Sequence, residues 1–573
     1  MTLGRKHWEL APTAPPVLFD RFRDLHPLVV QVLYNRGLTD LAEVTAFLAG
    51  EVISDNPFQL RGVEQAVTLI RRRIQEGASI AVYGDYDVDG VTATAILVQT
   101  LTALGAQVTP YIPDRLEEGY GLNVEALTQL AQQGTRLLIT VDCGIRSLEE
   151  VAHARAQGMS VIVTDHHHVG AALPQAEAVI NPRQPGCPYP SKDLAGAGVA
   201  FKLAQALLRA NHKVPLPTTA AELSEEALLD LVALGTIADM VPLLGENHVL
   251  TRRGMARLNR GQRPGLAALI DVSGLEPGQI TATTVSFQLS PRLNAAGRIS
   301  DAVTALQLLL APDLGAALPL AQELDRLNRE RQDLTQVVHE HAQALIAAQE
   351  EEPLLLFAAS SEFPVGILGL AAGRLLDRFY RPVVVVEQGE VFSKGSARSI
   401  PEFHITEALD SVAPLLERYG GHAAAAGFTI RTERLPQLRA RLQTLAEAQL
   451  RELNLRPQLF ADAELPLEQL SWDVLAALEM LAPFGYGNPR PVLVSRRVRV
   501  LHARTVGAEG RHLKLFLGDQ GGHSWDAIAF RQGDWMGRLP QYIDVAYVLE
   551  RNEWNGNVRL QLNVKDIHAS GGE

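Results

Sequence analysis

The stretch IAVYGDYDVDG, residues 80–90, is a short apolar run that ends in an acidic turn. Two similar stretches follow it: residues 137–141 lead into Asp142-Cys143-Gly144, and residues 161–164 lead into Asp165-His166-His167. Short runs that are rich in β-branched residues and end in polar loops are typical of buried parallel strands. We therefore predict an α/β fold in which several strand ends carry acidic or histidine side chains.

The segments between these runs have helical patterns. Residues 91–104 and 147–157 are each followed by a glycine, Gly105 or Gly158, that is suited to a helix C-terminus. An alternation of strand, crossover helix and strand places successive strand ends at one edge of a parallel sheet, where open α/β folds bind ligands. The sequence thus predicts one cleft lined by carboxylates that lie far apart in the chain.

Three carboxylates crowd the first of these turns. Asp85, Asp87 and Asp89 would repel one another and raise their pKa values unless a cation lies among them. A hard divalent ion such as Mg²⁺ or Mn²⁺ suits an oxygen-rich site with one imidazole. The alternative is an acidic, solvated turn, because Asp and Gly are common turn residues. The metal site is favoured because Asp142 and the Asp165-His166-His167 triplet are expected at the same edge of the sheet.

A fourth segment adds one more carboxylate. Residues 231–242 are almost wholly apolar except for Asp239. A buried carboxylate is unfavourable unless it is paired or bound to a metal. We expect Asp239 to join the metal site, and the alternative is a carboxylate that caps a helix or forms a salt bridge.

These motifs resemble those of a known family. Residues 85–90, Asp142, residues 165–167 and residues 235–239 resemble the four motifs of the DHH phosphoesterase superfamily. Residues 194–203, 291–298, 418–422, 483–489 and 552–554 resemble segments of its bacterial single-strand-specific exonucleases. The resemblance extends from about Trp8 to Ile567. Many superfamily members have a histidine two residues before the aspartate of the Gly-Asp pair, where this chain has Tyr83.

The resemblance implies a site with two ions, Mn²⁺ or Mg²⁺. One would be held by Asp89, Asp142, His166 and Asp239, and the other by Asp85, Asp87 and the bridging Asp142. Two such ions activate a bridging water and stabilise the attacking and leaving oxygens of an in-line displacement. His167 would contact the scissile phosphate, so His167, Arg292 and Asp142 are the expected catalytic residues. The expected DNA contacts are Arg292, Asn294, Arg298, Ser396, Arg398, Gly420, Gly421 and His422.

Arg292 and Arg298 have a structural alternative to a role at the phosphate. A guanidinium group matches the geometry of a phosphate, but it also pairs with carboxylates and with helix C-termini. Both interpretations of the two arginines stay open at the level of the sequence.

Composition restricts the class of protein. A chain of 573 residues should form three or four domains. Its net charge of −13 argues against broad binding to duplex nucleic acid and favours a confined channel lined by local arginines. No apolar run is long enough to span a bilayer, and the first residues contain no signal-peptide core. The two cysteines, Cys143 and Cys187, lack metal-finger spacing and indicate a reduced cytoplasm.

Five regions are expected along the chain. They are a small helical or irregular leader at residues 1–45, the DHH catalytic domain at 46–310, a connecting helix at 311–351, the DHH-associated (DHHA1) domain at 352–455 and an OB-fold at 456–573. Pro319 is suited to open the connecting helix. In the second α/β domain, strands are predicted at residues 353–358 and 382–386, and residues 394–399 and 420–422 are predicted to form loops.

The last region has an all-β pattern. Leu513, Leu515 and Leu517 alternate with other residues, and Asn555-Gly556 is a strong hairpin turn. Several short strands of this kind fit a small β-barrel such as an OB-fold, which often binds single strands. The expected fold is therefore two α/β lobes joined by a long helix, followed by a β-barrel.

The leading hypothesis is a metal-dependent, 5′→3′ single-stranded-DNA exonuclease that releases 5′-mononucleotides in DNA repair and recombination. A monomer is expected, with single-strand-binding protein and a recombination helicase as partners. One alternative is a phosphodiesterase or pyrophosphatase for very short substrates, as in smaller DHH proteins. Another is a catalytically dead DNA-binding scaffold, which the intact set of ligands disfavours.

Overall fold

The computed structural model describes residues 6–51, 55–115, 118–119, 121–349, 353–519, 521–554 and 556–571 of the chain. The chain folds as two compact units. The first, here called the catalytic unit, contains residues 40–331 and the separate segment 482–489. The second, here called the barrel unit, contains residues up to 39, residues 332–481 and residues from 490 onward.

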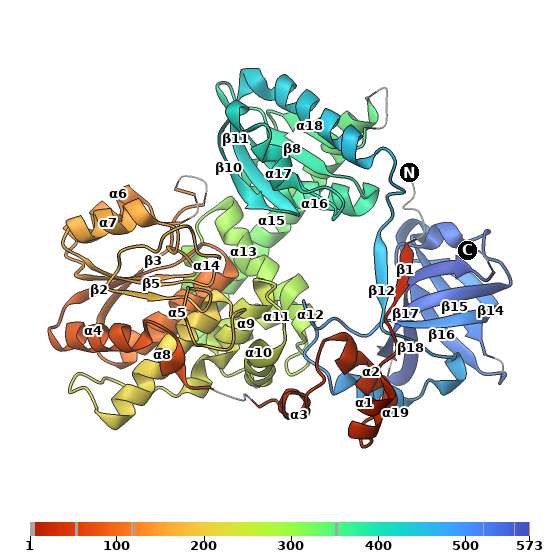
Figure 1. Cartoon of the computed structure of the whole chain (residues 1–573), viewed down its shortest axis with the longest axis horizontal. Helices are drawn as coiled ribbons and strands as arrows, with labels where there is room; N and C mark the ends of the chain where they lie inside the picture. Colours follow the sequence, from red (N-terminus) through yellow and green to blue (C-terminus); the bar gives the residue numbers. More distant parts are fainter. Residues whose placement is uncertain are drawn as a thin grey trace. The chain divides into compact units, whose positions relative to one another are not determined.

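A long helix, α15 (Leu314–Ala347), contributes residues to both units (Figure 1). The expected connecting helix is therefore present, but Pro319 lies inside it and does not open it. Proline at this position removes one hydrogen bond, to the carbonyl of Gly315. The helix continues because its apolar side chains, Ala317, Ala321 and Leu324 among them, are fully buried.

The catalytic unit is built on a parallel sheet. The strand order is β3-β2-β4-β5-β6, and neighbouring strands all pair in parallel. The strands are β2 (Ser79–Tyr83), β3 (Gln107–Tyr111), β4 (Leu137–Val141), β5 (Ser160–Thr164) and β6 (Ala178–Ile180). The residues of β4 are buried along its whole length, as expected for a strand covered on both faces. The predicted α/β fold is confirmed.

Helices cover both faces of this sheet (Figure 1). One face packs on α4 (Val63–Gln75), α5 (Val88–Ala103) and α8 (Gly196–Lys213), which share one apolar core with the sheet. The other face packs on α6 (Val124–Gln132) and α7 (Leu148–Ala156) through a separate core. The helical remainder of the unit consists of α3 (Leu41–Ala49), α9 (Leu229–Ala238), α10 (Gly245–Leu258), α11 (Pro264–Val272), α12 (Ala282–Thr284), a π-helical turn (Val285–Leu289), α13 (Ser290–Ile299) and α14 (Val303–Leu310).

The order of the strands explains where a ligand can bind. From β2 the chain passes through α5 to β3 on one side, whereas β4 pairs with the other side of β2. The connections that leave the C-terminal ends of β2 and β4 therefore diverge, and such a switch point leaves a crevice at the sheet edge. The acidic turn after β2 and Asp142 after β4 lie at this switch point.

The barrel unit contains a second α/β domain. Its sheet has the order β10-β11-β9-β8-β7, in which only the β7–β8 pair is parallel. The strands are β7 (Leu356–Ser360), β8 (Val383–Glu387), β9 (Phe392–Arg398), β10 (Leu416–His422) and β11 (Ala425–Arg431). The helices are α16 (Leu368–Phe379), α17 (Ile405–Asp410) and α18 (Leu435–Leu450).

Two segments predicted as loops lie in this sheet. Residues 394–398 belong to β9 and residues 420–422 belong to β10, so the loop prediction is wrong for both. The glycines suggested turns, but Gly395 is needed because a Cβ there would lie 2.1 Å from the ring of Phe428 on β11. A glycine in a strand often marks such a close approach.

The C-terminal region is a closed barrel. Strands β14 (Leu493–Val506), β15 (His512–Gly518), β16 (Ser524–Ala529), β18 (Asn557–Ala569) and β17 (Tyr542–Trp554) pair in that order, and β14 pairs with β17 to close the ring. This topology is that of an OB-fold, which confirms the predicted barrel. The hairpin turn expected at Asn555-Gly556 includes residue 555, which lies outside the described residues.

Short elements precede the barrel in sequence and complete the barrel unit. They are α1 (Pro16–Arg21), α2 (Pro27–Asn35), β12 (Gln458–Ala461), β13 (Ala463–Glu464) and α19 (Trp472–Glu479). A further strand, β1 (His7–Leu10), pairs in parallel with β12, which lies far from it in the sequence. The predicted helical or irregular leader thus contains a strand, which local pattern could not reveal because its partner lies about 450 residues away. In the part of the chain that the structure describes, no helix has the length and apolar character needed to cross a membrane.

Candidate metal centre

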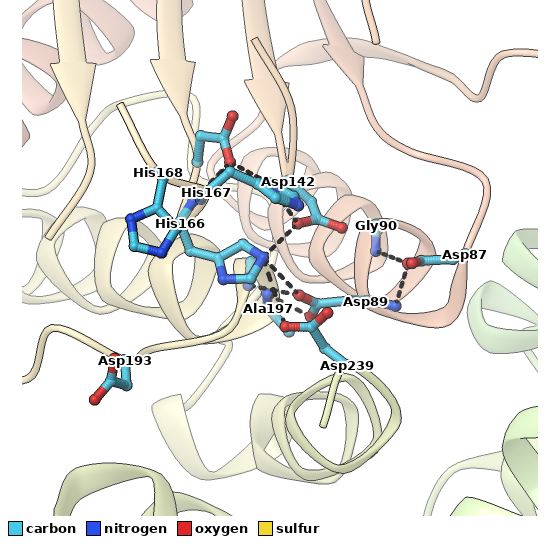
Figure 2. A network of polar contacts seen from close by, with 12 residues as sticks. Asp87, Asp89, Gly90, Asp142, His166, His167, His168, Asp193, Ala197 and Asp239 are labelled. Carbon is cyan, nitrogen blue, oxygen red and sulfur yellow. Dashed lines mark hydrogen bonds and ion pairs between the residues drawn. The ribbon is translucent and has the colours of Figure 1, made fainter. Parts of the chain in front are cut away.

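The acidic turn after β2 leads directly into helix α5. Asp85 is buried behind the strand end, and Asp87 is the N-cap of α5, where its Oδ1 accepts hydrogen bonds from the amides of Asp89 (2.9 Å) and Gly90 (3.1 Å) (Figure 2). This N-cap fixes the direction of the helix and places Asp89 in its first turn. Local capping chemistry thus presents three carboxylates within five residues.

Asp89 is held by the start of a second helix. Its carboxylate accepts hydrogen bonds from the amides of Gly196 (2.6 Å) and Ala197 (2.8 Å) at the N-terminus of α8. These bonds and the helix dipole favour the charged form. Burial and the charge of Asp87 outweigh them and raise the pKa of Asp89 to about 7. The side chain is therefore oriented, but the bonds and the nearby charge of His167 do not offset its burial.

Asp142 and His166 come from the next two strand ends. Asp142 has a φ of 61°, a left-handed conformation that is uncommon for residues other than glycine and is often found at functional sites. Nε2 of His166 lies 3.1 Å from Asp142 Oδ1, 3.5 Å from Asp239 Oδ2 and 3.8 Å from Asp89 Oδ2 (Figure 2). Three carboxylates from three separate segments thus converge on one imidazole nitrogen.

Asp165 organises this loop. It is buried, its Oδ2 accepts a hydrogen bond from the amide of Ile145 (2.9 Å), and its Oδ1 lies 2.8 Å from Nδ1 of His167. Burial alone would raise the pKa of Asp165, but the bond and charge of His167 lower it. Burial likewise opposes protonation of His167, yet Asp165 raises the pKa of His167 above its ordinary value. The pair fixes the ring of His167 and favours its positive form.

The residues present fit divalent cations. Ligand atoms of Asp89, His166 and Asp239 lie within 4.8 Å of one another, as do those of Asp85, Asp87 and Asp142. Burial and mutual repulsion raise the pKa of Asp85, Asp142 and Asp239, the last to about 9. Oδ1 of Asp85 is buried and accepts no hydrogen bond from the described residues. Such a concentration of buried and half-buried negative charge is costly unless cations neutralise it.

A substitution of Asp239 tests whether its charge destabilises the metal-free protein. Burial, then the charges of Asp89 and Asp87, raise the pKa of Asp239 from its ordinary value to about 9. The pKa of Asp239 is higher in the folded state than in the unfolded state. The stability that protonated Asp239 contributes to the fold is therefore present below about pH 4, and it is lost as the pH rises toward 9. Asp239→Asn keeps a neutral group there. In EDTA we expect the Tm of this variant to exceed that of the wild type by a margin that grows by at least about 2 °C between pH 5 and pH 9.

Thermal melts at several pH values, with EDTA and with Mn²⁺, check this expectation. With saturating Mn²⁺ the order should reverse at pH 8, because the wild type gains the ion. A margin that stays constant across the pH range in EDTA would show that Asp239 carries no buried charge.

Tyr83 does not take part in the site. The resemblance leads us to expect a histidine at this position, but the tyrosine side chain is fully buried in the core shared with α6 and α7. Its hydroxyl donates to the carbonyl of Gly121 (3.1 Å), and its ring stacks on Tyr111. The carboxylates of Asp85 and Asp87, and not a residue at position 83, therefore surround the second potential ion position.

The remaining expected site residues divide between the two units. In the catalytic unit, Asn294 accepts a hydrogen bond from the amide of Val88 (3.2 Å) and so touches the start of α5. Arg292, on the same helix α13, bonds to Asp325 (Nε–Oδ1, 2.9 Å) and to the carbonyl of Gln288 (2.7 Å). This is the carboxylate pairing named as its structural alternative. Arg298 also lies on α13, and its positive charge lowers the pKa of Tyr86 in the acidic turn, which burial raises.

Ser396, Arg398 and the Gly420-Gly421-His422 run lie in the barrel unit, on β9 and β10. Arg398 donates to the Oγ of Ser396 (3.3 Å), and Gly369 at the start of α16 leaves room for both, because a Cβ there would lie 2.8 Å from Arg398 Nη2. His422 and its two glycines are exposed at the end of their strand.

Some functional residues were not predicted from the sequence. The sequence pattern predicts neither the contact of Asp165 with His167 nor the bonds from the amides of Gly196 and Ala197 to Asp89. The signal for the amides was present in the small residues of the Ala195-Gly196-Ala197-Gly198 run. A Cβ at position 196 would lie 2.6 Å from Asp142 Oδ1, so only glycine fits there.

Comparison with known proteins agrees with this geometry. The model of the DHH family N-terminal domain matches residues 79–236, that of the DHHA1 domain matches 352–448, and that of the RecJ OB domain matches 461–566. An acidic sheet edge of this kind followed by a DHHA1 domain defines a metal-dependent phosphoesterase of the DHH type.

The match to one group of relatives extends over the whole chain. The single-stranded-DNA-specific exonuclease RecJ of Bacillus subtilis (strain 168) is 38% identical over 578 residues, which cover 100% of this chain and 72% of that protein. RecJ of Escherichia coli (strain K12) is 38% identical over 567 residues, which cover 95% of this chain and 96% of that protein. The crystal structure of RecJ from Thermus thermophilus in complex with Mn²⁺ matches with a TM-score of 0.84 at 33% identity, covering 99% of this chain and 81% of that chain. The chain therefore belongs to the RecJ family.

Proposed function

We propose that the chain is a metal-dependent exonuclease that degrades single-stranded DNA from the 5′ end and releases 5′-mononucleotides. The observation that carries this proposal is the convergence of Asp89, Asp142 and Asp239 on Nε2 of His166 at the switch point of the sheet. It is supported by the family, whose named members are single-stranded-DNA-specific exonucleases. Crystal structures of RecJ from Thermus thermophilus contain Mn²⁺ or Mg²⁺.

The chain's own residues prepare the site for a phosphodiester. We assign Asp89, Asp142, His166 and Asp239 to one Mn²⁺ or Mg²⁺ ion, and Asp85, Asp87 and Asp142 to a second. When bound, such ions supply an activated water and neutralise charge on the phosphate. Without them, the buried carboxylates would repel the anionic backbone of DNA. Metal loading thus decides whether the crevice accepts the substrate.

His167 can supply positive charge at this site. Asp165 fixes the ring through Nδ1, so the opposite nitrogen, Nε2, is the one that can donate to a phosphate oxygen. The raised pKa of His167 favours the protonated form that such a bond needs. Arg292, Asn294 and Arg298 on α13 are assigned to the DNA strand, and we propose that Asp325 orients Arg292 for this role through the 2.9 Å bond to its Nε.

The barrel unit is assigned to strand binding. We propose that Ser396, Arg398, Gly420, Gly421 and His422 contact the DNA backbone and that the OB barrel binds the single strand beyond them. Arg398→Ala should raise the KM for a single-stranded oligonucleotide roughly 10–100-fold with little change in kcat, because a charge-assisted hydrogen bond contributes about 1.5–3 kcal/mol.

Steady-state digestion of an end-labelled oligonucleotide measures this effect. Arg441→Ala is the matched control, because Arg441 is an exposed arginine on α18 of the same domain. An equal change in KM for both variants would assign the effect to general loss of positive charge.

The same proposal covers the organisation of the protein and its setting. The proposed parts of the chain are a leader (1–45), the DHH domain (46–310), the connecting helix (311–351), the DHHA1 domain (352–455) and the OB domain (456–573). Each of the three regions that match a family model lies inside the proposed domain of the same type. The proposal places the protein in the cytoplasm as a monomer that acts in DNA repair and recombination. Its proposed partners are single-strand-binding protein and a recombination helicase.

One experiment tests the proposed function. Single- and double-stranded DNA of the same sequence, labelled separately at each end, is digested with Mn²⁺, Mg²⁺ or EDTA. We expect metal-dependent release of mononucleotides from the 5′ end of the single strand alone. Cleavage of dinucleotides or pyrophosphate only would instead indicate a phosphodiesterase for small substrates, and binding without cleavage would indicate a scaffold.

A further inference from the structure

The segment Pro483–Pro489 is separated from its neighbours in sequence by its place in the fold. In sequence it precedes the barrel, but residues 482–489 belong to the compact catalytic unit. The amide of Gly485 donates to the carbonyl of Asn488 (2.9 Å) and the amide of Asn488 donates back to that of Gly485 (3.2 Å), so the segment is a tight hairpin. Asn488 is fully buried and its Nδ2 donates to the carbonyl of Pro483 (3.0 Å).

This hairpin contacts the turn that begins at Asp239. Helix α9 ends at Ala238, and the chain then passes through Asp239, Met240 and Val241 to Pro242 and Leu243. The amide of Leu243 donates to the carbonyl of Tyr486 (2.8 Å). The contact is too close for side chains on the hairpin: a Cβ at Gly487 would lie 2.8 Å from Pro242 Cβ, and a Cβ at Gly485 would lie 2.7 Å from Leu243 Cδ1.

The turn itself needs support from outside. Met240, the residue directly after Asp239, has a φ of 60° and a side chain that is 65% exposed, so its own packing does not impose this left-handed conformation. Such conformations persist where surrounding structure over-determines them. Asn247 donates to the carbonyl of Pro242 (3.1 Å) and to that of Asp193 (2.6 Å). The hairpin and Asn247 therefore hold the same end of the turn.

We infer that the Pro483–Pro489 hairpin is a positioning element for Asp239 and thereby for metal binding. It fixes the end of the turn at Pro242 and Leu243, and this end determines where the carboxylate of Asp239 lies relative to Asp89 and His166. Residues that orient metal ligands typically change metal affinity or activity 10–100-fold when they are altered. The inference rests on the proposed metal site but not on the exonuclease activity.

The test is Mn²⁺ binding by the full-length protein, measured by isothermal titration calorimetry. Gly487→Ala places a methyl group against Pro242 at a position with a φ of +73°. We expect Mn²⁺ affinity about 10-fold below the wild type, and a similar rise in the Mn²⁺ concentration for half-maximal digestion. Gly537→Ala is the matched control, because its φ is +83° and a Cβ there meets no atom within 4 Å. It should bind Mn²⁺ as the wild type does.

A cycle with Asp239→Asn shows whether the effect passes through that ligand. In the Asp239→Asn background, Gly487→Ala should change Mn²⁺ affinity less than about 2-fold, because the positioned group is gone. A persistent loss of about 10-fold there, or wild-type affinity in the single variant, would overturn the inference. If Gly487→Ala does not fold, Asn488→Ala keeps the test available, because it removes the side-chain bond to the carbonyl of Pro483 and should lower the affinity in the same direction. Absence of Mn²⁺ binding by the wild type would count against the proposed function instead.

Discussion

Replacement of Asp142 by asparagine is expected to lower the rate of single-strand digestion by about 10³-fold or more, because the ions at such a site supply several kcal/mol of transition-state stabilisation and each 1.36 kcal/mol is about tenfold in rate. Asp142 belongs to both assigned ion positions. Asparagine is the appropriate substitution, because it tolerates the left-handed backbone that Asp142 adopts, with a φ of 61°, far better than alanine does. The measurement is single-turnover digestion of 5′-labelled single-stranded DNA with saturating Mn²⁺.

Two controls separate chemistry from folding. The Tm of Asp142→Asn in EDTA should equal or exceed that of the wild type, because the raised pKa of Asp142 marks a destabilising charge. Asp193→Asn alters a half-exposed carboxylate that pairs with Arg183 and lies apart from the cluster in Figure 2, and it should retain most of the activity. Loss of activity in both variants to the same extent would contradict the assigned role of Asp142.

Gly235→Ala should also abolish most of the activity, although glycine contributes no chemical group. A Cβ at this position in α9 would lie 2.4 Å from Thr92 Oγ1, 2.6 Å from the Cβ of Ala197 and 2.7 Å from Asp89 Oδ1. The packed interior cannot absorb this, so α9 must move away from α5 and α8 and displace Asp89. We expect digestion to fall about 100-fold and the Mn²⁺ requirement to rise, because changes in the groups that surround metal ligands have effects of about 10–100-fold.

Gly373→Ala is the matched control for this prediction. Gly373 lies inside helix α16, where a Cβ meets no atom within 4 Å, so alanine should stabilise the helix by about 1 kcal/mol and leave digestion unchanged. Digestion rates across a Mn²⁺ titration distinguish the two variants. Wild-type activity in Gly235→Ala would mean that the helices adjust without moving Asp89.

The convergence of side chains at the candidate metal centre could be predicted from the sequence, because most of them follow strand ends. Short apolar runs predict β2, β4 and β5, and parallel pairing of these strands brings their C-terminal ends to one edge of the sheet. The run around Asp239 was recognisable because a carboxylate is conspicuous in an apolar helix. In these cases a local pattern and a general rule of topology were sufficient.

What escaped prediction depends on contacts between distant segments. The amides of Gly196 and Ala197 have no side chain to reveal that they bind Asp89, more than one hundred residues away. The glycines of residues 394–398 suggested a loop, whereas the ring of Phe428 on the neighbouring strand is the reason for Gly395. Proximity of this kind exists only in the folded chain, so no local pattern encodes it.

Strand β1 has a consequence for biosynthesis. His7–Leu10 pairs only with Gln458–Ala461 among the described strands, so it lacks this partner until residue 461 has been made. At roughly 5–20 residues per second this delay is about 20–90 s. Residues 40–331 are complete well before then and can collapse around their own sheet. The β1 segment must therefore wait for its partner strand while the roughly 450 residues between them are synthesised.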